Sequence, residues 1–360
     1  MTEDLQSGRS YQAQGPGAKR WLSLLLAVVV MAAVFFYLNQ PTPYYVTRPG
    51  SAIELRPIVA VEGGNKSKEA GTFMLTTVRM GEANRLWYWY AKMSPDVELM
   101  EKELVVQKGE TDEDYTRREL AVMDNSQKIA EAVAFRLAGY EVKIEKRGVV
   151  VMGTIAGMPA KNVLQVGDVI TAVDQQKITD ANDMLKSLAG KKAGDVVQLT
   201  FLRDDKPQQA TLKLAPLPGE PTRAGIGIQQ DNDQLIEVPK QVTISADGIG
   251  GPSAGLMFTL EIYNQLLQDQ DLTKGYRIAG TGTISADGTV GRIGGINHKV
   301  VAADAADAEI FFAPDDSQGE PSNYAEAVQT AKRIGTHMKI VPVKTVDDAI
   351  AFLKTLPPKR

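Results

Sequence analysis

The hydrophobic pattern divides the chain into an apolar N-terminal run, a strand-rich middle and a C-terminal part in which helix and strand patterns alternate. Residues 21–38 carry no charged side chain. At a helical rise of about 1.5 Å per residue they span about 27 Å, close to the thickness of the bilayer's hydrocarbon core. The pattern therefore predicts a single transmembrane helix over 21–38.

The basic residues around this run predict its orientation. Arg9, Lys19 and Arg20 precede it, whereas the next basic residue after it is Arg48. Because positive charges stay in the cytoplasm, residues 1–20 are expected to form a cytoplasmic tail, with everything after the helix outside the cell. A cleaved signal peptide is the alternative, but Tyr37-Leu38-Asn39-Gln40-Pro41 lacks the small residues of a cleavage site, which favours an uncleaved anchor in the cell membrane.

Residues 39–138 are expected to form an extracytoplasmic N-terminal region. The proline-rich stretch 39–56 is interpreted as an extended exit from the membrane, with the fold beginning after it. A β-rich run follows at 71–78, and four-residue apolar spacing predicts a helix over 115–137. The aromatic cluster at 87–90 is either a membrane-surface patch or, as we favour, a surface that packs against a partner domain.

Residues 139–217 show the alternation typical of β-strands. Strands are expected over 149–155, 169–173, 196–203 and 209–214, with a short helix over 180–188. Together with Arg147-Gly148-Val149-Val150 and the run Gln165-Val166-Gly167-Asp168-Val169-Ile170, this order resembles the PDZ domains of bacterial periplasmic proteases. The resemblance implies a peptide terminus held by backbone N–H groups at Arg147, Gly148 and Val149, with the peptide added as an extra strand.

Residues 222–360, beyond a proline-rich hinge, are expected to form an α/β layer domain. Helices are predicted over 253–267, 300–308, 325–333 and 346–356, and strands over 242–246, 277–284, 290–293, 309–312 and 339–343. The whole chain is thus expected to be a multidomain α+β and α/β protein: a transmembrane helix, a PDZ-like β domain and a C-terminal α/β domain.

The most informative motif in the last domain is Gly250-Gly251-Pro252-Ser253-Ala254-Gly255. Proline suits the first helical turn, so the motif predicts Ser253 at a helix N-terminus. There the free backbone N–H groups stabilise an oxyanion, and the small neighbours Gly251 and Ala254 leave room for a substrate carbonyl. The alternative is a glycine-rich helix start in which the serine serves only as a cap.

Three chemistries are open to this serine. A nucleotide-binding loop requires a lysine that does not follow, so no nucleotide is expected. Gly251-x-Ser253-x-Gly255 also fits the nucleophile elbow of α/β-hydrolases, for which His337 would be the base. The third is a Ser-Lys dyad, in which burial lowers the pKa of a lysine until its neutral amine accepts the serine proton.

A lysine suited to that third chemistry is Lys299, in Gly294-Gly295-Ile296-Asn297-His298-Lys299 before an alanine-rich helix. Together with Gly-Pro-Ser-Ala-Gly and Thr-Gly-Thr-Ile, this motif resembles the proteolytic domain of Lon-type serine peptidases. The whole arrangement is similar to the membrane-anchored Lon-like proteases of Gram-positive bacteria that have no ATPase module. The resemblance implies Ser253 as nucleophile, Lys299 as general base and Thr281 as the residue supporting the lysine. Gly250 departs from the family, where aspartate is frequent, although Asp247 is near in sequence.

The amino-acid composition argues against several further classes of function. The net charge of −4 argues against nucleic-acid binding, and the absence of cysteine excludes cysteine proteases and thiolate metal sites. No metal or other cofactor is expected. The sequence therefore predicts an ATP-independent, membrane-anchored serine endopeptidase that cleaves exported or membrane-bound peptides and proteins. A catalytically inactive PDZ scaffold or chaperone, and a Ser-His hydrolase, are the alternatives.

Overall fold

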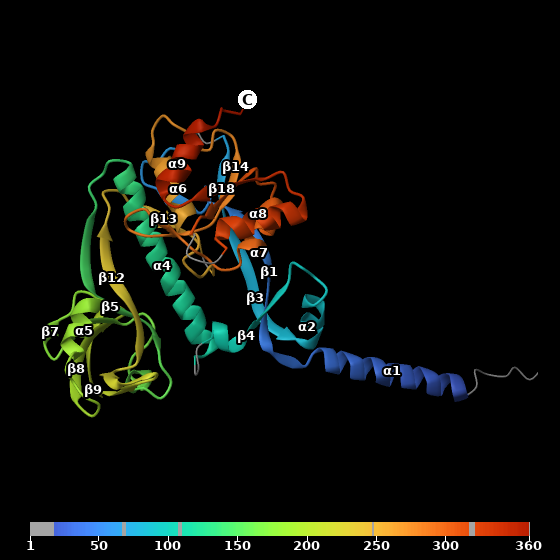
Figure 1. Cartoon of the computed structure of the whole chain (residues 1–360), viewed down its shortest axis with the longest axis horizontal. Helices are drawn as coiled ribbons and strands as arrows, with labels where there is room; N and C mark the ends of the chain where they lie inside the picture. The colour runs from blue at the N-terminus through green and yellow to red at the C-terminus, as the bar shows by residue number, and fades with distance from the viewer. Residues whose placement is uncertain (1–17, 67–69, 107–109, 247, 317–320, 360) are drawn as a thin grey trace, which may run out of the picture.

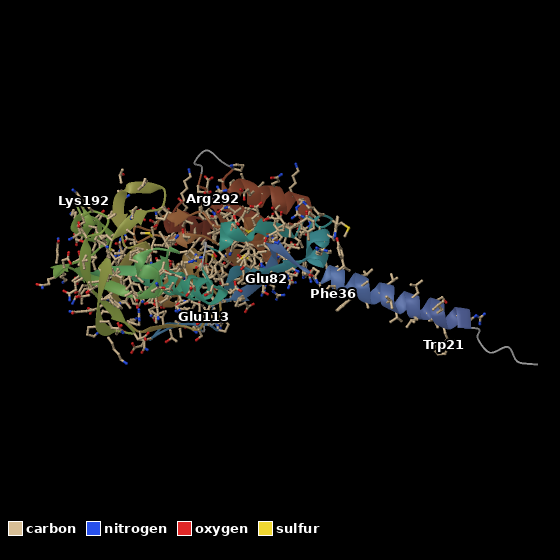
Figure 2. The ribbon with its side chains drawn as sticks, turned by 90° about the horizontal axis from the view of Figure 1, so that it is seen from below. Trp21, Phe36, Glu82, Glu113, Lys192 and Arg292 are labelled. Carbon is tan, nitrogen blue, oxygen red and sulfur yellow. The ribbon has the colours of Figure 1, made fainter. Side chains whose placement is uncertain are left out.

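The computed structural model describes residues 18–359 except 67–69, 107–109, 247 and 317–320. Helix α1 (Ala18–Leu38) projects from the folded body, and most of its side chains, among them Trp21 and Phe36, stand clear of the rest of the chain (Figures 1 and 2). Within the described residues it is the one helix long and apolar enough to cross a membrane, over Arg20–Leu38. Its position near the N-terminus is compatible with a membrane span and with a signal sequence.

The main sheet is mixed and draws on both ends of the chain. Its order is β18-β17-β14-β3-β1-β4. The strands are β1 (Pro41–Glu54), β3 (Thr72–Asn84), β4 (Glu98–Glu101), β14 (Arg277–Gly280), β17 (Ile310–Pro314) and β18 (Lys339–Val343). Strand β3 pairs antiparallel with β1 and parallel with β14, which joins segments about 200 residues apart.

Strand β1 overturns the expectation that the fold begins after residue 56. It lies inside the sheet, between β3 and β4. Its prolines are accommodated because Pro41 is the first residue of the strand and Pro49 lies at a register shift, two positions where a missing N–H is tolerated. The membrane-proximal segment is therefore a structural part of the main sheet.

Helices cover both faces of this sheet (Figure 1). On one face lie α4 (Asp112–Leu137), α6 (Gly255–Leu266) and α9 (Val346–Thr355), which pack on inward residues such as Phe73, Leu75 and Phe312. On the other lie α7 (Ile296–Asp304) and α8 (Asn323–Ile334), packed on the alternate residues Met74, Ala279 and Phe311. The period-two alternation of buried residues along each strand is what allows a helix layer on either side.

Helix α6 is buried nearly all round, because α4 packs over its outer side. The predicted helix over 115–137 is confirmed as α4, with Thr111 as its N-cap. This helix leads straight into the second sheet, so it connects the two folded units.

The second sheet has the order β12-β5-β6-β8-β9, with β7 paired to β6. Its elements are β5 (Lys143–Thr154), η1 (Pro159–Asn162), β6 (Val169–Val173), β7 (Gln176–Lys177), α5 (Ala181–Leu188), β8 (Val196–Arg203), β9 (Lys206–Lys213) and β12 (Ile228–Glu237). The predictions of strands over 169–173 and 196–203 are confirmed. A separate core of buried side chains, among them Val149, Ile170 and Phe201, fills this unit.

The remaining short elements link these layers. Strand β2 (Val59–Val61) pairs with β13 (Val242–Ile244), and β10 (Ala215–Leu217) forms a hairpin with β11 (Glu220–Gly225) where a hinge was expected. The expected strand over 277–284 is broken into β14 and β15 (Thr283–Ile284), and β15 pairs with β16 (Val290–Gly291). Helices α2 (Arg85–Ala91) and α3 (Lys102–Val105) lie next to β4.

The structure divides the chain differently from the sequence boundaries. Residues 39–138 do not form a separate region, because β1, β3, β4 and α4 belong to the same layers as the C-terminal strands. Residues 228–237, expected at the start of the last domain, instead form strand β12 of the second sheet. The second sheet is thus an insertion between α4 and β13.

Candidate active site

The loop that carries Ser253 is held from two sides. From α4, the carbonyl of Glu119 accepts the Gly251 N–H at 2.9 Å, and the Ser126 hydroxyl donates to the Pro252 carbonyl at 3.1 Å. From the opposite side, the Gly282 N–H donates to the Ser253 carbonyl at 2.9 Å. These bonds fix the backbone immediately before α6, which begins at Gly255.

Lys299 reaches this serine from α7. Its Nζ donates to Ser253 Oγ at 3.0 Å and to the Thr76 carbonyl of β3 at 2.6 Å. The residue is only 4% exposed, and burial lowers the pKa of its amine from 10.5 to about 8. The lysine is therefore poised to lose its proton not far above neutral pH, within hydrogen-bond reach of a hydroxyl.

The backbone N–H groups around Ser253 differ in whether they already donate to an acceptor in the protein. In the described part of the chain, those of Ser253 and Ala254 donate to no protein acceptor. The N–H of Gly251 is instead occupied by Glu119, so this glycine shapes the loop, at φ +85°, rather than offering a free donor. Ser253 and Ala254, at the start of α6, are the pair suited to receive an oxyanion.

Thr281 lies beside Ser253, but its hydroxyl does not contact Lys299. Its Oγ1 donates to the Ser253 carbonyl at 2.9 Å, and the residue is fully buried. The break between β14 and β15 makes this possible, because the Thr281 N–H pairs with Phe312 while the next residue turns toward the serine loop. The family resemblance implies that Thr281 supports the lysine. In the present geometry such support would act indirectly, through the loop that carries Ser253.

The packing around Gly250 explains why glycine, and not aspartate, stands at this position. A Cβ at this position would lie 2.8 Å from the Cβ of Glu119 on α4, closer than side chains approach. The carboxylate of Glu119 itself lies near the loop, with Oε2 3.2 Å from where a Cβ of Gly251 would be. Burial raises the pKa of this carboxyl, so an acidic group is supplied here by α4. Asp247 lies outside the described residues.

The two histidines occupy other positions. His298, adjacent to Lys299, also lines the cleft that opens onto Ser253. Its Nε2 lies 3.2 Å from Thr47 Oγ1 and 3.6 Å from Glu98, and in the described chain it makes no hydrogen bond to the serine. The hydrogen bond with His298 lowers the pKa of the Glu98 carboxyl. His337 is exposed after α8 and is absent from the described residues that line the serine's cleft.

A cleft of about 750 Å³ opens onto the serine and the lysine. Its walls come from β1, β3 and β4 of the main sheet, from α4 and from the loop 248–254. Apolar side chains dominate away from the polar pair, among them Ile53, Met80, Met100 and Met123. A cleft of this size and lining accommodates several residues of an extended peptide.

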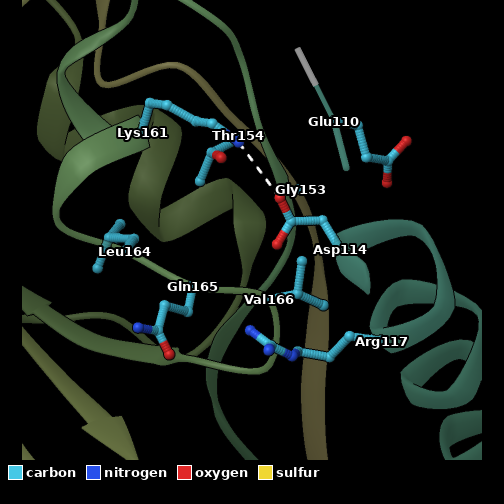
Figure 3. Close-up of a pocket in the computed structure, with 9 residues that line it drawn as sticks. All are labelled: Glu110, Asp114, Arg117, Gly153, Thr154, Lys161, Leu164, Gln165 and Val166. Carbon is cyan, nitrogen blue, oxygen red and sulfur yellow. Dashed lines mark hydrogen bonds and ion pairs between the residues drawn. The ribbon is translucent and has the colours of Figure 1, made fainter. Parts of the chain in front are cut away.

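A smaller pocket of about 170 Å³ lies between α4 and the second sheet (Figure 3). Glu110, Asp114 and Arg117 face Gly153, Thr154 and Lys161 across it, and Lys161 pairs with Asp114 at 3.3 Å. Among the described residues, no group of three or more metal-ligating side chains is present here or elsewhere. The contact serves to hold the second sheet against α4.

The structure corrects the peptide-binding positions expected in the second sheet. Gly148 and Val149 lie on β5, which pairs with β12 on one side and β6 on the other, so no strand can add there. Arg147 is engaged by Asp233 at 2.7 Å. The sequence pattern located the sheet but could not show that a later segment would occupy this edge.

Strand β9 lies at one edge of this sheet in the described chain, and β12 lies at the other. The Asn232 side chain of β12 accepts the Ala181 N–H at the start of α5 at 2.8 Å, so this edge faces the helix. The loop before it, Gly225-Ile226-Gly227-Ile228, places Gly227 at φ +82°. The paired glycines were the available signal for this loop, and sequence reasoning missed it.

Two family models match consecutive parts of the chain, and the second match includes β12 of the second sheet. Residues 137–214 match the PDZ domain model, and residues 223–355 match the model of the Lon protease (S16) C-terminal proteolytic domain. The chain therefore combines a segment that matches PDZ domains with a segment that matches the proteolytic domain of Lon (S16) proteases.

Curated relatives match over short stretches. Serine protease Do-like HtrA of Lactococcus lactis is 39% identical over 69 residues, 19% of this chain and 17% of the relative. A probable periplasmic serine endoprotease DegP-like of Rhizobium meliloti is 30% identical over 115 residues, 29% of this chain and 23% of the relative. The chain thus spans less than a quarter of the length of either relative.

Solved structures match over a similar share of the chain. The PDZ domain of an SdrC-like protein from Listeria monocytogenes is 34% identical, with a TM-score of 0.23, and covers 24% of this chain and 92% of that one. The protein GtR34C from Geobacillus thermodenitrificans is 40% identical, with a TM-score of 0.22, and covers 24% of this chain and 98% of that one.

Proposed function

We propose that the protein is a membrane-anchored serine endopeptidase that uses Ser253 and Lys299 as a catalytic dyad. The observation that carries this proposal is the 3.0 Å contact between Lys299 Nζ and Ser253 Oγ, made by a lysine whose burial lowers its pKa to about 8. A solvated lysine would stay charged at neutral pH and could not accept a proton.

The reaction follows from the positions of these groups. Neutral Lys299 takes the proton of Ser253 as Oγ bonds to the substrate carbonyl carbon, and the N–H groups of Ser253 and Ala254 receive the oxyanion. Lys299 then gives its proton to the departing amine as the peptide C–N bond breaks. Water attacks the acyl-enzyme with the same lysine as base, which releases the carboxylic acid and restores the hydroxyl.

Anchorage by α1 is the second element of the proposal. The helix is long and apolar enough to span a membrane over Arg20–Leu38, and the basic residues nearest to it, Lys19 and Arg20, lie at its N-terminal end, whereas the next one after it is Arg48. This arrangement favours a cytoplasmic N-terminus and a catalytic domain outside the cell. Substrates are then exported or membrane-bound peptides and proteins, cleaved without ATP.

Peptide recognition by the PDZ domain is the third element. The free edge of β12, next to α5, offers backbone groups for an added strand, and the loop 225–228 offers N–H groups for a peptide carboxylate. Peptide termini would therefore dock at β12 and not at the interior strand β5.

The deciding experiment compares the purified full-length chain with its Ser253→Ala variant on unstructured protein substrates. We expect cleavage by the first and none by the second, with only a small difference in thermal stability, because the half-buried Ser253 hydroxyl has one hydrogen-bond partner, worth about 1 kcal/mol. Cleavage by neither protein would favour the PDZ scaffold, and equal cleavage by both would refute Ser253. Protease added to intact cells should remove the folded domains but spare an N-terminal epitope.

A further inference from the structure

Helix α2 presents an apolar face that the rest of the chain leaves uncovered. Leu86, Trp89, Tyr90 and Met93 are 53%, 53%, 48% and 77% exposed. Their spacing is i, i+3, i+4 and i+7, which places them on one side of the helix and the turn that follows it. We call these four residues the α2 outer face.

The opposite side of α2 is apolar as well. Trp87 and Ala91 pack against the small cluster of Val46, Ala83 and Val97. A helix that is apolar on every side is normally buried in protein or in a membrane. Four large apolar side chains that stay in water gain none of the free energy that burial of their surface would contribute. The outer face therefore requires a covering surface.

The neighbourhood of α2 indicates which surface this is. The Arg85 guanidinium stacks on the Tyr37 ring at 4.3 Å from its centroid, and the Arg85 N–H donates to the Gln40 carbonyl at 3.0 Å. These bonds tie the start of α2 to the end of α1. Figures 1 and 2 show α1 leaving the body at this end, whereas the PDZ domain lies at the far end.

We propose that the α2 outer face lies in the headgroup region of the same membrane that α1 spans, which makes it a second attachment point. The inference rests on the proposed anchorage by α1. Tryptophan and tyrosine are the side chains enriched at membrane interfaces, and Arg48, Arg85 and Lys92 around the helix suit anionic headgroups. Continuity with α1 favours lipid over a second copy of the chain.

Attachment at two points would orient the active site. Strand β1 follows α1 directly, and β3 ends at Asn84, the N-cap of α2. The same strands and β4 contribute Arg79, Met80 and Met100 to the cleft. The membrane would therefore hold the mouth of the cleft near its surface, suited to segments of substrate that emerge from the bilayer.

The absence of cysteine allows a direct test. Single cysteines at Leu86, Trp89 and Met93 would carry a nitroxide label, with the full-length protein held at one chain per nanodisc of mixed zwitterionic and anionic lipid. Val196, 60% exposed in the PDZ domain, is the matched control, and Val29 on α1 reports the anchor. For each nitroxide label, the frequency of collision with oxygen, which concentrates in lipid, is compared with the frequency of collision with a water-soluble nickel chelate.

We expect the three α2 labels to shift toward oxygen and away from nickel, relative to Val196. Labels as accessible to nickel as Val196, with Val29 in the bilayer, would overturn the inference and leave the anchorage intact. Protection from both reagents would overturn it too, because protein would then cover the face. A water-accessible label at Val29 would refute the anchorage itself, and the inference, which rests on that anchorage, would fall with it.

Discussion

The backbone N–H of Gly251 donates to the carbonyl of Glu119 at 2.9 Å, so the loop that carries Ser253 is held by helix α4. This helix precedes the PDZ sheet, and the last strand of that sheet, β12, leads back toward the same loop. Ser253 is thus positioned by the connection between the two folded units, and not by the α6 helix start alone.

This packing predicts the effect of a methyl group at Gly250. In Gly250→Ala the new Cβ would lie 2.8 Å from Glu119 Cβ, so α4 or the loop must move. Overpacking of this kind costs about 1–3 kcal/mol, and a displaced nucleophile should lower kcat by at least about 10-fold. Thermal unfolding and peptide cleavage measure the two effects. Gly81→Ala, which meets nothing within 4 Å, is the matched control, and equal behaviour of the two variants would contradict the proposed role of α4.

The lowered pKa of Lys299 predicts the pH dependence of cleavage. The base acts in its neutral form, so activity should rise with pH through about 8 and level off above it. Lys299→Arg should be inactive, because a guanidinium does not deprotonate in proteins. His337→Ala should behave as wild type. An active Lys299→Arg together with an inactive His337→Ala would instead identify the Ser-His hydrolase.

Local patterns predicted much of the secondary structure but little of the pairing. Strands β6, β8 and β18 and helix α4 follow from periodicity, which depends on neighbouring residues only. The pairing of β3 with β14 depends on contacts between distant segments, and no local pattern reports these. For that reason the proline-rich stretch before residue 56 was expected to be an exit segment, although it forms β1.

The same distinction applies to the site. Ser253 and Lys299 stand in recognisable motifs, so the sequence could nominate both. Their third neighbour, the Thr76 carbonyl that accepts a hydrogen bond from Lys299, is a backbone group on a strand 223 residues away and leaves no motif. Glu119 likewise enters the site from α4, because a long helix crosses the loop.

The position of Thr281 separates two roles for its hydroxyl. It donates to the Ser253 carbonyl, so Thr281→Val should lose one buried hydrogen bond of about 1 kcal/mol and lower kcat about 5-fold to 10-fold. The midpoint of the pH profile should not move, since the hydroxyl does not contact the lysine. An upward or downward shift of that midpoint would show that Thr281 acts on Lys299 itself. Thr281→Ser, which keeps the hydroxyl, is the control.

The unpaired side of strand β12 predicts where a peptide docks on the PDZ domain. Strand β5 is paired on both sides, whereas β12 is paired only with β5 in the described chain. Peptides with a free carboxylate and an apolar last residue, bound to the Ser253→Ala chain, should slow amide hydrogen exchange in 228–237 and 181–188. Added hydrogen bonds along β12 are the reason.

The matched control for this measurement is the same peptide with an amidated C-terminus, which loses the carboxylate that the loop 225–228 would receive. We expect weaker protection of β12 from the amide, and no peptide-dependent change at Arg147, Gly148 or Val149, because their strand is already paired on both sides. Protection from amide exchange that begins at Arg147 and leaves β12 unchanged would require β12 to detach from β5. It would show that the peptide binds at β5 instead.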